Sequence, residues 1–405
     1  MLWIKNVLLE KGYVEHPSLG YKTDTELSVL GIDHGKIVTI SDTLPDNATD
    51  IFDAQGYLAI PSLVDNHIHL DKGHLGGPWQ AVVPMQTVAD RIHEEEGFLE
   101  SFLVKTPQRA QALIDLVGSY GATFLRVHVN VDPVIGLQNL QCIRDVLESN
   151  AHRMDFELVA FPQHGTLATE NDKWLTQAMQ QPGVHVIGGL DPATIDRNID
   201  ASLTVLFELA QTYHKEIDIH LHDHGTLGIF EIERIVDYTE KYGLKGHVQI
   251  SHAYALGDVS LDVVAKIAQR LATFDIAINT TVPIDTPAPH IPTLQDAGVR
   301  VHVINDNIND HWSPFGTGDL IQRASRAAER FNLTDEIALS QSLGLVTRGK
   351  TPLTPSGERV WPKIGDCANI LFVKAESSAH AIARVPQDRV LMFKGAFMTP
   401  HFRKY

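Results

Sequence analysis

The chain has few cysteines, and it lacks both a basic excess and a long apolar run. Its 405 residues include only Cys142 and Cys367, far apart and outside any C-x-x-C pair. Neither a disulfide framework nor a thiolate zinc knuckle is therefore predicted. The formal net charge is −17 and no segment gathers lysines and arginines, which disfavours nucleic acid and anionic membrane surfaces as partners. No apolar run reaches the roughly 18 residues that a membrane-spanning helix needs.

The amino terminus carries no recognisable targeting signal. In MLWIKNVLLEKG, Lys5 lies near the start of the apolar run and Glu10 closes it. A basic n-region and a small-residue cleavage site are both missing. With 43% hydrophobic and 20% charged residues the composition is that of an ordinary globular protein. We expect a cytoplasmic protein.

Eight apolar or β-branched runs alternate with helix-like stretches from Pro61 onward. The runs are SLVDNHIHL, GATFLRVHVNV, FELVAFPQ, VHVIGGL, EIDIHLH, GHVQISH, TFDIAINTTVP and VRVHVINDN. Intervening stretches such as IDASLTVLFELAQTYH repeat their apolar residues at helical spacing. An open doubly wound sheet usually has five or six strands and a glycine-rich first turn, which is missing here. The pattern therefore favours an α/β fold with a (β/α)₈ TIM barrel.

Both chain ends are rich in strand signals instead. Short β-rich runs separated by turn residues precede Pro61, and CANILFVKA and RVLMFKGAFM follow about Lys350. We predict that residues 1–60 and 350–405 build one small β-sandwich domain. Residues 61–349 would form the barrel.

Polar side chains end most of the predicted barrel strands, which is where the catalytic groups of such barrels gather. These residues are His67 and His69, His128 and Asn130, Gln163 and His164, His220, His222 and Asp223, His252, and Asp306 with Asn307. A single histidine at a strand end is more often structural than functional. Histidines at the ends of five strands would not be expected to converge by chance, so the pattern indicates a site.

A metal centre is the simplest use of these histidines. Residues two apart in a strand point to one face, so His67 and His69 can share an ion. His220 and Asp306 would complete the set, since imidazoles with one carboxylate suit Zn²⁺ or Fe²⁺. We predict one divalent ion per subunit, with Zn²⁺ preferred and Fe²⁺ as the alternative. His128 is left open between lining the pocket and supporting the ligands.

Two other histidines have helical, charged surroundings. His93 lies in RIHEEEGF and His214 in QTYHKE. HEEEG also lacks the second histidine of a zincin helix. We predict that both are solvated surface residues.

The order and spacing of these motifs resemble a known family. HIHLDK, RVHVNVD, FPQHG, IHLHDHGT, ISHA and NDNINDHWSPFGTGD are similar to the motifs of the amidohydrolase superfamily, specifically its cytosine deaminase branch. The resemblance is closer still to the N-isopropylammelide isopropylamidohydrolases, which act on s-triazine rings, in the motifs GGLDPAT, HLHDHGTLG and DNINDHWSPFG. The resemblance implies an amidohydrolase-type barrel with one metal on the four residues named above. VIGGLDPAT contains no lysine. Two-metal relatives have a lysine at this place, and its carboxylated side chain bridges their two metal ions.

The resemblance also implies catalytic roles. Asp306 would accept the proton of the attacking water, and His252 would orient that water. Asp223 stands where cytosine deaminase has a glutamate that shuttles protons, one methylene longer. Because of this departure, His222 on the same strand remains a second candidate for the shuttle.

The predicted substrate-binding residues are Gln163, Lys72, Asn307, Trp312 and His128. Gln163 and Lys72 match positions of the related enzymes, although an exposed rim lysine is the alternative for Lys72. Asn307 stands where cytosine deaminase has a second aspartate. The pattern of hydrogen-bond donors and acceptors that the site prefers on its substrate ring should therefore differ. Trp312 could form a wall against a flat ring, as could Trp79, for which structural packing is the alternative.

These observations together predict a metal-dependent hydrolytic deaminase. It would remove an amino or alkylamino group from a small nitrogen heterocycle, cytosine-like or s-triazine-like, by attack of metal-bound hydroxide. The C–N bonds that the enzyme cleaves would be those of cyclic amidines. We also expect the protein to form a homo-oligomer. A cyclic amide hydrolase of the dihydropyrimidinase type is one alternative. A metal-free barrel scaffold that binds partners is another.

Overall fold

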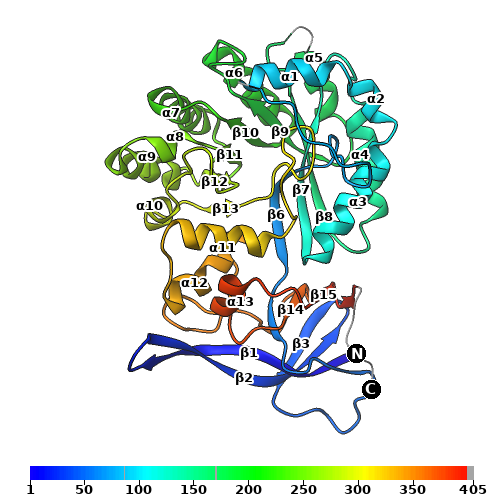
Figure 1. The fold of residues 1–405 in the computed structure, drawn as a ribbon, viewed down its shortest axis with the longest axis vertical. Helices are drawn as coiled ribbons and strands as arrows, with labels where there is room; N and C mark the ends of the chain where they lie inside the picture. Colours follow the sequence, from blue (N-terminus) through cyan, green and yellow to red (C-terminus); the bar gives the residue numbers. More distant parts are fainter. Residues whose placement is uncertain (86, 169–170, 399–405) are drawn as a thin grey trace. The chain divides into compact units, whose positions relative to one another are not determined.

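The computed structural model describes residues 1–85, 87–168 and 171–398. The chain divides into two compact units (Figure 1). The barrel unit comprises Asn66–Asp115 and Leu125–Gly318, and the end unit comprises Met1–Asp65, Leu116–Phe124 and Asp319–Tyr405. The predicted domain boundaries at 60/61 and 349/350 stay a prediction. Residues 399–405 of the predicted end domain lie outside the described residues.

Eight parallel strands follow one another around the barrel in chain order. They are β6 (Leu63–His69), β7 (Ala122–Asn130), β8 (Asp155–Phe161), β9 (Val184–Leu190), β10 (Glu216–Leu221), β11 (Val248–His252), β12 (Ala277–Thr280) and β13 (Val301–Val303). A parallel bridge between Ile68 and Asp306 brings the two ends of this sheet together. Each strand overlaps the run predicted for it, so the (β/α)₈ barrel is confirmed.

The alternation within β10 shows how the barrel positions polar groups. Ile217, Ile219 and Leu221 have no exposed surface and alternate with Asp218 and His220. Successive side chains of a strand point to opposite faces. The apolar residues therefore face the surrounding helices, and the polar pair enters the barrel interior.

Helices separate most of the barrel strands (Figure 1). They are α1 (Val88–Glu96), α2 (Leu99–Leu103), α3 (Thr106–Ser119), α4 (Gln138–Ser149), α5 (Asn171–Met179), α6 (Ile199–Tyr213), α7 (Gly225–Tyr242), α8 (Ala255–Asp258), α9 (Leu261–Thr273) and α10 (Ile291–Asp296). In α9 the buried residues Val264, Ile267, Ala268 and Leu271 recur at the spacing of one helix face. None of the helices within the described ranges is long and apolar enough to cross a membrane.

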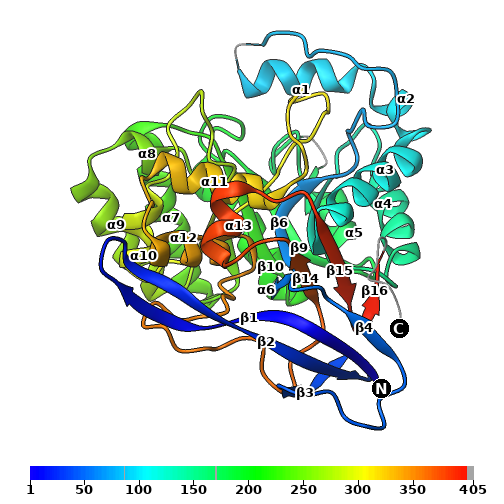
Figure 2. The same cartoon turned by 60° about the horizontal axis from the view of Figure 1, so that its bottom comes forward.

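The second sheet lies in the end unit and joins both ends of the chain (Figure 2). Its strands are β1 (Leu2–His16), β2 (Gly20–Asp33), β3 (Lys36–Ser41), β4 (Ile51–Asp53), β5 (Leu58–Pro61), β14 (Ile370–Val373), β15 (Arg389–Phe393) and β16 (Ala396–Phe397). The order is β16-β15-β14-β5-β1-β2-β3, with β4 paired to β1. Antiparallel pairing of β14 with β5 makes the connection. A small β-domain built from both ends is thus confirmed.

Four short helical elements complete the end unit. They are α11 (Leu320–Arg330), α12 (Glu336–Ser342), η1 (Leu343–Val346) and α13 (Ser378–Arg384). Asp319 caps α11 by accepting a hydrogen bond from the Ile321 backbone N–H at 3.0 Å. The same carboxylate accepts two hydrogen bonds from the buried guanidinium of Arg389, at 2.9 and 2.6 Å. Removal of either partner would leave a buried charge uncompensated.

We expect Asp319→Ala to lower the free energy of unfolding by about 3–5 kcal/mol, because Arg389 would stay buried without its carboxylate. Chemical denaturation followed by circular dichroism measures this loss. Arg300→Ala is the control, since it removes an exposed pair with Asp275 and should cost at most about 1 kcal/mol. Equal losses in the two variants would contradict the interpretation.

Candidate metal centre

Four of the predicted residues converge at the carboxyl ends of the barrel strands. One ligand atom each from His67, His69, His220 and Asp306 lies within 4.8 Å of the other three. The Oδ1 atom of Asp306 is 3.3 Å from Nε2 of His67 and 3.4 Å from Nε2 of His69. The Nε2 atoms of His69 and His220 are 3.3 Å apart.

These spacings fit a divalent cation. A tetrahedral Zn²⁺ ion with bonds of about 2.0–2.1 Å keeps its ligand atoms about 3.3–3.4 Å apart. The Nε2 atoms of His69 and His220 face one another, and two neutral acceptor nitrogens repel unless a cation or a hydrogen lies between them. The chemistry of the donor set, three imidazoles and one carboxylate, is also that of known zinc and iron sites.

The electrostatics of the cluster favour the metal-binding forms of His69, His220 and Asp306. Burial lowers the pKa of His69 to about 3, and burial also holds the pKa of His220 well below its ordinary value. Burial alone would raise the pKa of Asp306, but hydrogen bonds with His67 and His69 hold that pKa well below its usual range. Neutral imidazoles and an ionised carboxylate are the forms that bind metals.

His252 lies beside these ligands at the end of β11. Its ring centroid is 5.4 Å from that of His67 and 5.2 Å from that of His220. Among the described residues, neither nitrogen of the buried His252 ring has a hydrogen-bond partner. His252 and Asp306 both have left-handed backbones, with φ of 70° and 61°. Such conformations cost non-glycine residues about 1–3 kcal/mol and cluster at functional sites.

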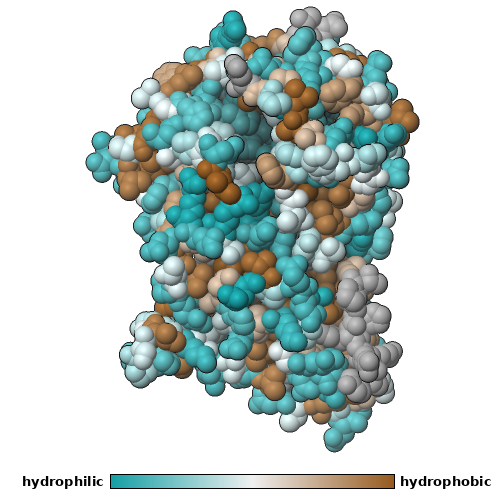
Figure 3. All heavy atoms as spheres, viewed as in Figure 1, coloured by the Kyte–Doolittle hydropathy of each residue, from teal (hydrophilic) through white to brown (hydrophobic). Residues whose placement is uncertain are grey.

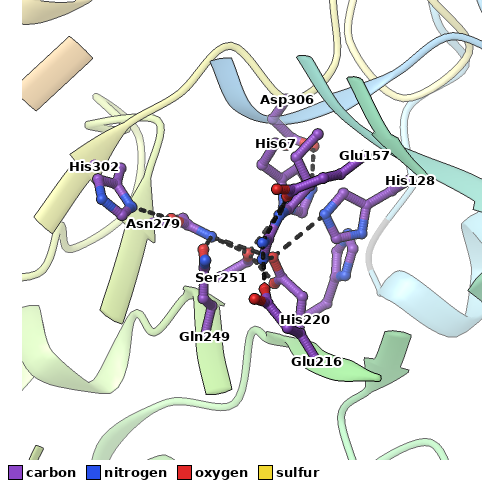
Figure 4. A network of polar contacts seen from close by, with 12 residues as sticks. His67, His128, Glu157, Glu216, His220, Gln249, Ser251, Asn279, His302 and Asp306 are labelled. Atoms are coloured by element: carbon purple, nitrogen blue, oxygen red, sulfur yellow. Dashed lines mark hydrogen bonds and ion pairs between the residues drawn. The ribbon is translucent and has the colours of Figure 1, made fainter. Parts of the chain in front are cut away.

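His128 belongs to a second possible metal-binding group, with His67 and Asp218. Figure 4 shows this part of the barrel interior. The His128 ring stacks on the His67 ring with centroids 3.7 Å apart. Asp218 already faces a cation, since Nη1 of Arg126 is 3.5 Å from its Oδ2 atom. The first group offers four candidate ligand atoms where the second offers three, one of which already faces Arg126, so the first group is the stronger candidate.

The two shuttle candidates have different partners. Nδ1 of His222 lies 2.8 Å from the carboxylate of Asp191, and the His222 ring stacks on His252 with centroids 4.4 Å apart. Although burial lowers the pKa of His222, Asp191 raises it above the ordinary value. Asp223 accepts a hydrogen bond from Thr194 at 3.1 Å.

Asp223 also interacts with a second acid, Glu231 of α7. Burial and the neighbouring Asp191 raise the pKa of Asp223. Burial and Asp223 in turn raise the pKa of Glu231 to about 9. Two carboxyl groups in contact cannot both ionise readily, so this pair holds a proton at neutral pH.

Lys72 is buried rather than exposed at the rim. Its ammonium group donates to Gln163 Oε1 at 2.7 Å and to Asn130 Oδ1 at 3.0 Å. The same group lies 5.6 Å from the centre of the Trp312 ring. Glu95 completes the cluster, with its Oε1 atom 3.7 Å from Lys72 and its Oε2 atom accepting from Trp312 Nε1 at 3.0 Å.

The remaining predicted residues are distributed as follows. The Asn307 amide donates to Asp310 at 2.6 Å, which orients its carbonyl oxygen away from that carboxylate. Trp79 is 76% exposed, and no described aromatic contact holds it. His93 and His214 are exposed, as predicted.

The sequence interpretation missed several of the residues in this centre. Glu95 lies in HEEEG, which looked like a solvated helix, yet Glu95 is fully buried. Asp218 is two residues before His220 and therefore on the same strand face, a signal that could have identified it. Ser251, whose Oγ atom lies 2.8 Å from Nδ1 of His67, carries no such signal in the sequence.

Figure 3, in the same view as Figure 1, shows a hollow in the barrel unit where Figure 1 places β9 and β10. Hydrophilic and hydrophobic side chains both surround it. Parallel barrels open their sites at the carboxyl ends of the strands, where the candidate ligands lie.

Comparisons with known proteins agree with this geometry. The chain is 39% identical over 398 residues to the uncharacterized protein YahJ of Escherichia coli (strain K12), covering 97% of this chain and 86% of that protein. It is 30% identical to N-isopropylammelide isopropylaminohydrolase from Burkholderia multivorans ATCC 17616, whose crystal structure matches with a TM-score of 0.85 over 98% of this chain and 97% of that one.

A second solved structure shares the fold. The 5-methylcytosine deaminase from Klebsiella pneumoniae is 24% identical and matches with a TM-score of 0.79, over 99% of this chain and 100% of that chain. Residues 110–392 match the amidohydrolase family. The chain therefore belongs to the amidohydrolase family and is a hydrolase that acts on C–N bonds.

Proposed function

We propose that the protein is a metal-dependent aminohydrolase that removes an amino or alkylamino group from a small nitrogen heterocycle. The convergence of His67, His69, His220 and Asp306 within 4.8 Å, in a barrel of this family, carries the proposal. The relative from Burkholderia multivorans favours an s-triazine-like ring over a cytosine-like one. Zn²⁺ is the preferred ion, with Fe²⁺ as the alternative.

Different residues of the chain would carry out different steps of the proposed reaction. A divalent cation supplies Lewis-acid chemistry, because it makes water acidic enough to provide a nucleophile at neutral pH. Asp306 is held ionised and can accept a proton at its carboxylate. His252, with both ring nitrogens unpaired among the described residues, can orient the attacking water or steady the developing charge.

The departing amine must gain a proton, and two groups can deliver it. Burial raises the pKa values of both Asp223 and Glu231, so the two carboxyl groups share a proton at neutral pH. His222 is oriented by Asp191 through Nδ1, so its Nε2 atom is directed elsewhere. We assign the transfer to Asp223, with His222 as the alternative.

The hydrogen-bond directions around Lys72 restrict the substrate. Gln163 uses its Oε1 atom to accept from Lys72, so its amide N–H groups remain for a ligand. Ammonium and amide groups are both donors. The ring edge that meets them should present acceptors, such as a carbonyl oxygen or a deprotonated ring nitrogen. Trp312 and Phe161, both near the ammonium, supply flat apolar contact.

Asp306→Asn tests the centre of this proposal. We expect turnover to fall by about 10²–10⁴-fold, because both a ligand charge and a proton acceptor are lost. Amine or ammonia release from cytosine, ammelide and N-alkyl ammelides, with mass detection, measures turnover. Asp296→Asn is the control, since Asp296 is exposed. Near-normal turnover with intact metal content would remove Asp306 from the mechanism.

Metal removal gives an independent test. The purified protein should hold about one zinc or iron ion per chain, and a chelator should abolish turnover that added Zn²⁺ or Fe²⁺ restores. Elemental analysis alongside the amine-release assay measures both quantities. Far less than one ion per chain, with no activity gained on addition of either metal, would favour the metal-free scaffold instead.

The proton shuttle can be assigned by comparing two variants. Asp223→Ala should lower kcat by about 10²-fold or more and leave substrate affinity largely unchanged. His222→Ala should have a smaller effect, and His247→Ala, which changes an exposed histidine, should have none. A larger loss in His222→Ala than in Asp223→Ala would move the assignment to His222.

A further inference from the structure

One ligand histidine is connected to a buried polar chain that the proposed reaction does not use. Nδ1 of His67 lies 2.8 Å from Ser251 Oγ (Figure 4), and this hydroxyl donates to Asp218 Oδ1 at 2.7 Å. All three side chains are fully buried. The contacts run across the barrel interior, from β6 to β11 and then to β10.

The single hydrogen of the Ser251 hydroxyl determines the direction of this chain. Asp218 faces the guanidinium of Arg126, with Nη1 3.5 Å from Oδ2, so it is a carboxylate that can only accept. Asn279 Nδ2 donates to Ser251 Oγ at 3.0 Å. A hydroxyl has one hydrogen and two acceptor sites. Since Asp218 takes the hydrogen and Asn279 fills one acceptor site, the group facing the other must donate.

The orientation of Asn279 supports this count. Its Nδ2 atom also donates to Gln249 Oε1 at 3.1 Å. Its Oδ1 atom lies 3.0 Å from Nδ1 of His302, which can donate to it. A reversed amide would place its oxygen against two acceptor oxygens, Gln249 Oε1 and Asp218 Oδ2. The donor end of Asn279 therefore points to Ser251.

We propose that Ser251 and Asp218 are positioning residues that hold His67 in the tautomer with hydrogen on Nδ1, so that the Nε2 lone pair faces the ligand cluster. This inference rests on the proposed function, because it concerns the same centre. Metal-binding histidines commonly donate their other N–H to a carboxylate. In this chain a serine connects the two groups.

His67 differs in this respect from the other two ligand histidines. Within the described residues, Nδ1 of His69 and Nδ1 of His220 have no hydrogen-bond partner. Asp218 is itself fixed, because Arg126 also binds Glu157 and Glu216 at 2.7 and 2.6 Å. The protein thus orients one ligand rigidly, through a charged cluster inside the barrel.

Ser251→Ala tests the proposal through metal binding. We expect the affinity for Zn²⁺, measured by competition with a chromophoric chelator, to fall about 10–100-fold. The absorption spectrum of the Co²⁺-loaded protein should change as well, since His67 would lose its fixed orientation. Thr239→Val is the matched control: it removes a buried hydroxyl that donates to the Ile235 carbonyl within α7 at 2.7 Å, and should alter neither quantity.

Histidine ¹⁵N NMR of the metal-free wild-type protein reads the tautomer directly. Nδ1 of His67 should carry the hydrogen, and Asp218→Asn should reduce that population, because an amide can donate to Ser251 and release its hydroxyl hydrogen towards His67. A folded Ser251→Ala protein with Zn²⁺ affinity within twofold of wild type and an unchanged Co²⁺ spectrum would overturn the proposal. So would His67 with hydrogen on Nε2. A wild-type protein that binds no metal would overturn the proposed function, whatever the tautomer.

Discussion

The closure of the barrel at one pair of backbone hydrogen bonds determines where the chemistry can occur. The Asp306 N–H donates to the His67 carbonyl at 2.9 Å, and the Asp306 carbonyl accepts from the His69 N–H at 3.4 Å. The segment after the last strand is thereby fixed against the first. Because Asp306 adopts φ of 61° there, its carboxylate meets both imidazoles. Residues more than 230 positions apart in sequence become neighbours through this closure.

The interior of this barrel is polar, and the burial of polar groups destabilises the folded state unless they are compensated. Arg126, His128 and Asp218 are almost completely buried, and each costs free energy unless its charges and hydrogen bonds are compensated. Arg126 and Asp218 compensate each other within this network, so removing Arg126 would leave a buried carboxylate exposed to that cost. An apolar filling would stabilise a barrel at least as well. The polar filling is therefore better explained by orientation of the ligand set than by stability.

Sequence reasoning located the strands and the residues of the candidate metal cluster because both follow from local rules. Apolar runs mark buried parallel strands, and spacing of two places His67 with His69 on one face. Asp306 could be added because barrels gather function at the ends of strands. Glu95 could not be found in this way, since its burial depends on how α1 packs rather than on its neighbours in HEEEG. The role of Ser251 likewise depends on three strands that only the fold brings together.

The surroundings of Lys72 show why charge alone would not select a substrate. Lys72 and Glu95 lie 3.7 Å apart, so their charges largely cancel at the position of a ligand. The net charge of −17 would also repel an anion at long range. Under the proposed function, discrimination between substrate rings must then come from hydrogen-bond direction, since a site built from buried donors penalises a ring that offers donors in return. Glu95 fixes two neighbours of Lys72, because it accepts from Asn130 at 2.8 Å and from Trp312 at 3.0 Å. Under the proposed function, this residue of α1 thus orients groups that a substrate ring would meet.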